Sequence, residues 1–409
     1  MRSCKHLVDV KVVLCFAFIF AQSSCSRKES SIEIFTPPAS EFPPFNGCVT
    51  TAQRAPLRGE ISMYKIDLDV PPRKRWTALL NDYRKEVLDL IGTIKDEFVG
   101  IFGESFYHLC DKYFPDLAKT LPEDYYEELL GIAEELDLHL SDVTLYNVFY
   151  ELFSVCTSIV IESPSGEIYH GRNLDFGLFM GWNIQNKTWI APELLRKLTV
   201  ILEFHKKGHV IYKAVNFVGY TGILTGVKQD AFSLTINERF RLNGGFVGIT
   251  EWIIGLRKEK WLGLLTREVM EYADTYTTAQ HLLSTPKLVA PVYFILAGTK
   301  PGEGSVITRG RDSSDIWPLG GENQRNASWY LVQTNSDHWK KPPFFDNRRD
   351  PAEYCLEKIG HKHPEKTLQS VLSTRPVLNK LTVYSAIMQA ASGNLNVWLQ
   401  DCADPCWPW

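Results

Sequence analysis

A single cysteine stands where a helical pattern gives way to a strand-like one. Cys156 opens the segment CTSIVIES (156–163), and Arg172 and Asp175 follow in HGRNLD (170–175). Attack by a cysteine on an acyl carbon requires a base, a fixed charge and an oxyanion donor beside the thiol. Cys156 can therefore be a nucleophile, one half of a disulfide, or a small buried hydrophobic residue, which is a common state of free cysteines.

A cysteine at the start of a strand can carry its own base. If the chain is cut before Cys156, the new α-amine belongs to the nucleophile itself, and its pKa of about 8 suits a base once it is lowered further. Taken alone, Arg172 and Asp175 could equally form a structural ion pair at a strand end. The catalytic interpretation is favoured by polar residues at the ends of later apolar strands, namely Asn237, Glu238, Asn335, Arg348 and Arg349.

The elements that must position these residues divide the chain at Cys156. Apolar residues at spacings of three and four predict helices from about 76 to 150. Beyond Cys156 the alternating pattern predicts two hairpins, 156–173 and 197–217, and a strand at 231–240. Helices are predicted at 248–285, and the remaining predicted strands lie at 291–298, 304–310, 329–335, 381–388 and 394–400.

Composition limits the class of protein. The chain has 409 residues and a formal charge of −4, so nothing favours nucleic acid as a partner. Its ten histidines would make the protein net positive in an acidic compartment, which favours docking on anionic lipid. Basic residues, an apolar run at 12–20 and small residues near 21–26 predict a secretory signal over residues 1–25.

Secretion makes disulfides the default state of the cysteines. Of the nine cysteines, six lie beyond the predicted signal: Cys48, Cys110, Cys156, Cys355, Cys402 and Cys406. The short CADPC loop (402–406) suits a local disulfide, and Cys48 and Cys355 could form a long-range one. The sequons at Asn186 and Asn326 are predicted glycosylation sites.

A family resemblance adds to these observations. The segments CTSIV, HGRNLDFG, GWNIQNKTW, FVGYTGILTG, NERF, QTNSDHW, LSTRPVLNKLTVY and DCADPC resemble the choloylglycine-hydrolase-like branch of the N-terminal-nucleophile hydrolases, from about residue 64 to the C-terminus. Within it the chain looks most like the ceramide-hydrolysing members, whose nearest relatives act on N-acylethanolamines.

The resemblance implies a fold and a maturation step. The expected fold class is α+β, an αββα sandwich preceded by a helical α-subunit. Self-cleavage between Val155 and Cys156 would give an α-subunit of residues 26–155 and a catalytic β-subunit of residues 156–409, an α/β heterodimer from one precursor. Disulfides Cys48–Cys355 and Cys402–Cys406 are implied, and Cys110 is expected to be free and buried.

It also implies roles for six residues. Cys156 matches the nucleophile, while Arg172 and Asp175 match the pair that positions the substrate amide and the new α-amine. Glu238 matches a carboxylate of self-cleavage. The last two are Asn335, which matches an oxyanion donor, and Arg348, which matches an arginine that orders the site.

The implied activity is hydrolysis of ceramide to sphingosine and a fatty acid through a cysteine thioester. No cofactor is expected, and no cluster of His, Cys, Asp and Glu has metal-ligand spacing. The implied partners are membrane-surface lipids and a saposin-type activator, and the implied location is the lysosome. The apolar segments 177–182 and 244–256 could line a lipid channel or belong to the core. N-acylethanolamine hydrolysis and a catalytically inactive lipid-binding homologue are the alternatives.

Overall fold

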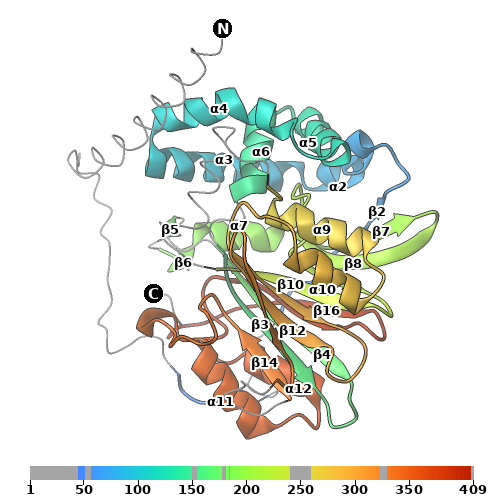
Figure 1. The fold of residues 1–409 in the computed structure, drawn as a ribbon. Coiled ribbons are helices and arrows are strands. Elements are labelled where there is room, and N and C mark those ends of the chain that lie inside the picture. Colours follow the sequence, from blue (N-terminus) through green and yellow to red (C-terminus); the bar gives the residue numbers. More distant parts are fainter. Residues whose placement is uncertain are drawn as a thin grey trace. The chain divides into compact units, whose positions relative to one another are not determined.

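Two stacked, mainly antiparallel sheets carry the predicted site (Figure 1). The structure is a computed structural model, and it describes residues 45–50, 57–149, 154–176, 181–183, 185–239, 259–321 and 329–406. The predicted signal, the apolar segment 244–256 and Asn326 lie outside the described residues, as does the side chain of Cys110.

The first sheet has six strands, and Cys156 lies on one of its inner strands. Its order is β1-β16-β15-β4-β3-β14. The strands are β1 (Leu57–Arg58), β16 (Asn394–Gln400), β15 (Thr382–Gln389), β4 (Ile168–Phe176), β3 (Ser154–Glu162) and β14 (Tyr330–Gln333). β3 and β4 form the predicted hairpin, with Cys156 opposite Leu174 and Ser158 opposite Arg172.

The second sheet has eight strands, in the order β13-β12-β11-β10-β9-β8-β7-β2. Its strands are β13 (Ser314–Pro318), β12 (Gly304–Arg309), β11 (Val292–Ala297), β10 (Phe232–Glu238), β9 (Thr225–Lys228), β8 (His209–Phe217), β7 (Thr199–Lys206) and β2 (Met63–Asp67). A separate pair, β5 (Trp182–Asn183) and β6 (Thr188–Trp189), forms a small hairpin.

Apolar side chains on alternate strand positions bury both faces of the first sheet. Val160 and Ile168 pack toward the second sheet with Tyr293, Ile295 and Val306. Residues of opposite parity, such as Ile159 and Ile161, pack under Leu356 and Leu368 of α11 (Arg349–Ile359) and α12 (Pro364–Leu372). On the second sheet lie α9 (Leu262–Tyr272) and α10 (Tyr276–Ser284). This layering confirms the predicted αββα sandwich.

The region before Cys156 is helical, as predicted, but it also supplies strands. Its helices are η3 (Pro72–Lys74), α2 (Thr77–Asp82), α3 (Arg84–Phe102), α4 (Glu104–Ala118), α5 (Glu123–Leu136) and α6 (Leu140–Phe149). β1 pairs with β16, and β2 runs parallel to β7, so this region adds an edge strand to each sheet. Neither strand was predicted, because β1 has two residues and the amphipathic pattern of β2 is short.

A buried ion pair fastens this helical region to the rest of the chain. Glu128 of α5 receives hydrogen bonds from Arg267 of α9 at 2.5 and 2.7 Å, and both side chains are fully buried. Arg75 and Trp76 donate to the same carboxylate, each at 2.9 Å. The four donors offset the cost of burying the charge, and they hold the pKa of Glu128 below its usual value against the opposing effect of burial.

Two further helices complete the described chain: α7 (Ile190–Lys197), which packs between α3 and β15, and η4 (Phe344–Asp346). α7, α11 and α12 were not predicted from the sequence. Among the described residues, no helix combines the length and apolarity needed to cross a bilayer.

Candidate active site

Cys156 lies in the interior of the sandwich. It is the third residue of β3, and its side chain is fully buried on the face that meets the second sheet. Its Sγ accepts a hydrogen bond from Arg172 Nη2 at 3.0 Å. Burial raises the pKa of the Cys156 thiol, and the positive charge of Arg172 opposes that rise. In the continuous chain the thiol form is therefore favoured.

Arg172 is a buried guanidinium aimed at this sulfur. Its Nη1 donates to the carbonyl oxygens of Leu224 and Ile236 at 3.1 and 2.7 Å, so backbone of the second sheet fixes the side chain. Within the described part of the chain its Nε has no acceptor. A buried donor left without an acceptor is costly. A negative charge or carbonyl oxygen arriving near Cys156 would therefore be stabilised.

Asp175 belongs to a different network from Arg172. The two residues are three positions apart on β4, and alternate strand residues point to opposite faces, so they cannot form the ion pair considered from sequence. Asp175 instead accepts from Thr382 Oγ1 at 2.6 Å, Asn379 Nδ2 at 2.9 Å and Arg348 Nη1 at 3.5 Å. Burial raises the pKa of Asp175 to about 6, although these partners favour the charged form.

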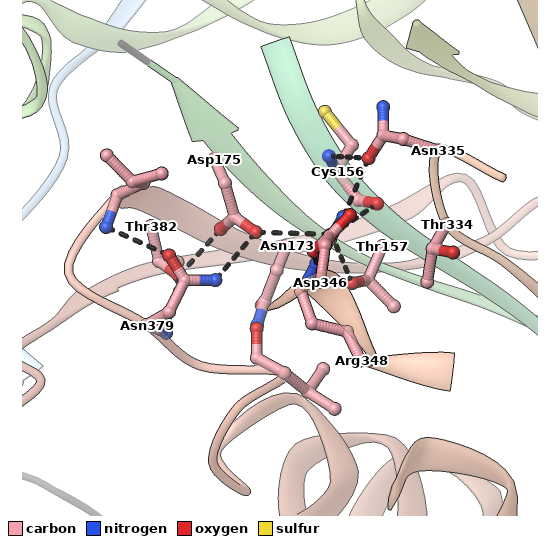
Figure 2. Close-up of polar contacts among 12 residues, drawn as sticks. Cys156, Thr157, Asn173, Asp175, Thr334, Asn335, Asp346, Arg348, Asn379 and Thr382 are labelled. Atoms are coloured by element: carbon pink, nitrogen blue, oxygen red, sulfur yellow. Dashed lines mark hydrogen bonds and ion pairs between the residues drawn. The ribbon is translucent and has the colours of Figure 1, made fainter. Parts of the chain in front are cut away.

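Arg348 connects the carboxylate to the cysteine backbone. Its Nη1 donates to the carbonyl oxygen of Cys156 at 2.6 Å. Its Nε and Nη2 hold both oxygens of Asp346 at 2.6 and 2.9 Å. Figure 2 shows this guanidinium between Asn335 on one side and Asp175 on the other. The paired Asp346 locks the planar Arg348 in this orientation.

The Asn335 side chain forms hydrogen bonds with the backbone on both sides of the Val155–Cys156 peptide bond. Its Oδ1 accepts from Cys156 N at 2.7 Å and from Arg348 Nη2 at 2.8 Å. Its Nδ2 donates to the carbonyl oxygens of Ser154 at 3.2 Å and Glu238 at 2.7 Å. Both amide hydrogens are engaged in the continuous chain. The donor that could serve a substrate oxyanion is occupied by Ser154.

Glu238 completes the group from the end of β10. Its Oε2 accepts from the backbone nitrogen of Ser154 at 3.1 Å. Together with Asn335 it holds Ser154, two residues before Cys156. All six predicted site residues are thus joined by direct contacts, and their chemical roles remain predictions.

Sequence reasoning missed the residues that support this group. Asp346 lies two residues before Arg348 in FFDNRRD and offered a detectable signal. Asn379 and Thr382 lie in the family segment LSTRPVLNKLTVY, but nothing in it singled out these two residues. Asn237, singled out from sequence, joins the sheets by accepting from Ser158 Oγ at 2.9 Å and donating to Gln333 O at 2.8 Å. Arg349 donates to Asp337 O and supports the loop after Asn335.

A small apolar pocket lies between the helical region and the second sheet. Leu121, Leu129 and Val148 line it from the helices, and Tyr220, Trp261 and Leu264 line it from the other side. The loop that bears Tyr220 continues to Leu224, whose carbonyl binds Arg172. The pocket wall and the cysteine site therefore share one loop.

Both predicted disulfides are present. Cys48 bonds Cys355 across 307 residues of sequence, and Cys402 bonds Cys406. Cys156 is the free cysteine found among the residues that the structure describes. Asn186 is exposed in the turn of the β5–β6 hairpin. In the described ranges, His, Cys, Asp and Glu form no group able to hold a metal ion.

Comparisons with known proteins agree with this geometry. Residues 156–352 match the family described as linear amide C–N hydrolases, choloylglycine hydrolase family, beginning at Cys156 itself. Residues 59–121 match the family described as the beta subunit of N-acylethanolamine-hydrolyzing acid amidase.

Similar individual proteins were also found. Acid ceramidase of Homo sapiens is 45% identical over 356 residues, covering 86% of this chain and 89% of that protein. Acid ceramidase of Mus musculus is 44% identical with the same coverage. A solved structure of the Caenorhabditis elegans ortholog of N-acylethanolamine-hydrolyzing acid amidase is 35% identical, covers 58% of this chain and 93% of its own, and has a TM-score of 0.49.

Proposed function

This chain belongs to the acid ceramidase group of the choloylglycine hydrolase family of linear amide C–N hydrolases, and from that premise we propose that it hydrolyses the amide bond of ceramide. It is an amidohydrolase. The products would be sphingosine and a free fatty acid. The observation that carries the proposal is the thiol of Cys156, held 3.0 Å from a buried guanidinium with an unused donor.

Activation begins with self-cleavage between Val155 and Cys156. Cys156 Sγ attacks the carbonyl carbon of Val155, and the C–N bond breaks as the nitrogen takes a proton. Water then hydrolyses the Val155 thioester, releasing the Val155 carboxylate and a free α-amine on Cys156. The hydrogen bonds that Asn335 and Glu238 form with Ser154 support this step, because they hold the peptide beside the bond that must break.

Cleavage would also change what Asn335 can do. When Ser154 leaves, one Nδ2 hydrogen of Asn335 becomes available. A substrate carbonyl could take the place of the Ser154 carbonyl, which supports the assignment of Asn335 as an oxyanion donor. Arg348 would keep the Asn335 side chain oriented through its bond to Oδ1 at 2.8 Å.

The catalytic cycle then repeats the chemistry on the lipid amide. The Cys156 thiolate attacks the carbonyl carbon of ceramide, and the α-ammonium of Cys156 protonates the leaving nitrogen. Sphingosine departs, and water hydrolyses the fatty-acyl thioester. At acidic pH an α-amine is protonated, so a thiolate–ammonium pair is the reactive state. Asp175 favours the ammonium form once it is ionised, and Arg172 favours the thiolate.

The substrate would be a lipid. Six apolar or aromatic side chains line the small pocket at the boundary between the two parts of the chain, and this pocket would have to widen to receive an alkyl chain. N-acylethanolamines are the alternative substrates, because residues 59–121 match a family described by that activity. Measuring hydrolysis of ceramide and of an N-acylethanolamine with the same acyl chain decides between them.

The proposed location and subunit composition of the protein rest on the same family membership. Two disulfides and an exposed sequon at Asn186 support passage through the secretory pathway. We place the mature protein in the lysosome, as an α-subunit and a β-subunit derived from residues 26–155 and 156–409. A saposin-type activator would present the lipid.

The test compares the purified protein with Cys156→Ala after incubation in mildly acidic buffer. Intact mass and N-terminal sequencing should give a new chain beginning Cys-Thr-Ser for the wild type, and one uncut chain for the variant. Cys110→Ala serves as the control and should be cut normally. If the wild type is cut but releases no fatty acid from ceramide, the proposal that ceramide is the substrate is wrong. An uncut wild type favours the inactive lipid-binding homologue.

A further inference from the structure

The segment between two site residues carries exposed aromatic side chains. Trp339–Phe345, here called the aromatic loop, lies between Asn335 and Arg348. Trp339 is 44% exposed, Phe344 69% and Phe345 51%. Exposure of three large aromatic side chains within seven residues is unusual, because their burial would ordinarily stabilise the fold.

Hydrogen bonds hold the backbone of the aromatic loop at both of its ends. Arg349 donates to the carbonyl oxygens of Asp337 and Lys340, and Lys340 N donates to Asp337 O at 2.9 Å. At the other end Asp346 N donates to Pro343 O at 3.0 Å, and Asp346 binds Arg348. Pro342 is buried in the middle. The loop therefore presents its aromatic residues from an anchored backbone.

Charge on the loop has one sign. Lys340 and Lys341 are exposed. The flanking carboxylates are buried: Asp337 is bound by Arg239 at 2.6 Å and Asp346 by Arg348, also at 2.6 Å. Asp337 also pairs with Lys340 at 3.4 Å, although the Lys340 side chain stays 62% exposed. Along the chain, the next exposed carboxylate after the loop is Asp350, in the first turn of α11. Two cations among three exposed aromatic rings complement a surface that is apolar within and anionic outside.

We propose that the aromatic loop is the element by which the protein docks on an anionic lipid bilayer. Phe344, Phe345 and Trp339 enter the interface, where aromatic rings are favoured, and Lys340 and Lys341 contact the headgroups. The proposal rests on the proposed function, since a two-chain amide stays in its bilayer. Asn335 and Arg348 flank the loop, so docking would hold the reacting groups close to the membrane surface.

Vesicle sedimentation tests the docking without requiring catalysis. Vesicles of phosphatidylcholine, with or without phosphatidylserine, are mixed with the wild type and with Phe344→Ser/Phe345→Ser. The double variant should bind about tenfold or more weakly, because two exposed rings no longer enter the interface. Lys341→Glu should weaken binding about fivefold, and only on the phosphatidylserine vesicles. Tyr272→Ser, which removes a 62% exposed aromatic of α9, is the matched control and should bind normally.

Activity on two substrate forms separates docking from chemistry. The double variant should lose vesicle-embedded ceramide hydrolysis in proportion to binding, and keep the wild-type rate on a short-chain amide in solution. Variants that bind vesicles like the wild type overturn the proposal. So does a loss restricted to stimulation by a lipid-presenting protein, which would make the loop a protein-docking site. If the wild type binds vesicles through the loop but hydrolyses no ceramide, only the proposed substrate fails.

Discussion

At the scale of single residues, the site is arranged as two charged networks on opposite faces of one sheet. Arg172 meets the Cys156 sulfur between the two sheets, whereas Arg348 binds the Cys156 carbonyl oxygen and Asp175 on the helix-covered face. The odd spacing in GRNLD produces this division, because it sends one charge to each face of β4. One strand thereby places Arg172 beside the sulfur and Asp175 beside the arginine that binds the backbone of the same residue.

The raised pKa of Asp175 predicts how stability changes with pH. Its pKa is about 6 in the folded chain against an ordinary 3.8, so the folded state binds a proton more tightly than the unfolded state between these values. The contribution of Asp175 to the free energy of unfolding is thus fully present below 3.8 and is lost as the pH rises through about 6. The loss amounts to about 3 kcal/mol.

This contribution can be measured by comparing the denaturant unfolding of two variants, Cys156→Ala and Cys156→Ala/Asp175→Asn. The Cys156→Ala change keeps the chain continuous in both. The difference in unfolding free energy between the two variants should shrink by about that amount from low to neutral pH, because asparagine does not titrate. A difference that stays constant with pH would show that Asp175 has the same pKa in the folded and unfolded chain.

At the scale of elements, the sequence predicted most strands after Cys156 because each alternates or is continuously apolar over six or more residues. β3, β4, β7, β8, β10, β11, β12, β15 and β16 were all predicted. α11 and α12 were missed, since RRDPAEYCLEKI and PEKTLQSVL have few apolar residues and both contain proline. Tertiary packing on the first sheet stabilises them, and that packing cannot be read from local spacing.

Prediction of the site was limited in the same way by contacts that form only in the folded chain. Cys156, Arg172 and Asp175 could be found because they occupy one hairpin. The three site residues beyond it, Glu238, Asn335 and Arg348, were found through polar strand ends and family motifs. Asn379 and Thr382 were missed because only folding brings residues 204 and 207 positions away to Asp175.

The buried pair Glu128–Arg267 is the element-scale contact with the largest expected cost. Glu128→Gln leaves Arg267 fully buried without this carboxylate, so we expect about 3–5 kcal/mol lower unfolding stability. Glu127→Gln, its neighbour on α5, breaks a half-exposed pair with Arg73 and should cost about 1 kcal/mol or less. Denaturant midpoints of both variants in the Cys156→Ala background make the comparison. Equal costs would mean that α5 does not depend on its buried anchor.

At the scale of the whole molecule, two kinds of link should keep the chain together after cleavage. Cys48–Cys355 joins the proposed subunits covalently, whereas Cys402–Cys406 lies within one of them. Independently of the disulfide, β1 and β2 lie in sheets formed mainly by the other subunit, and Glu128 binds Arg267. Covalent and noncovalent links therefore act in parallel.

Cleaved protein should consequently separate only when both kinds of link are removed. On a denaturing gel without reductant it should run as one species, and with reductant as two. Cys48→Ser should give two chains without reductant, yet elute as one particle on size exclusion under native conditions, because the strands and the ion pair remain. Cys402→Ser/Cys406→Ser should behave like the wild type in both measurements. Native separation of Cys48→Ser would contradict the structure, since it would mean that two inserted strands and a fully buried ion pair cannot hold the helical region in place.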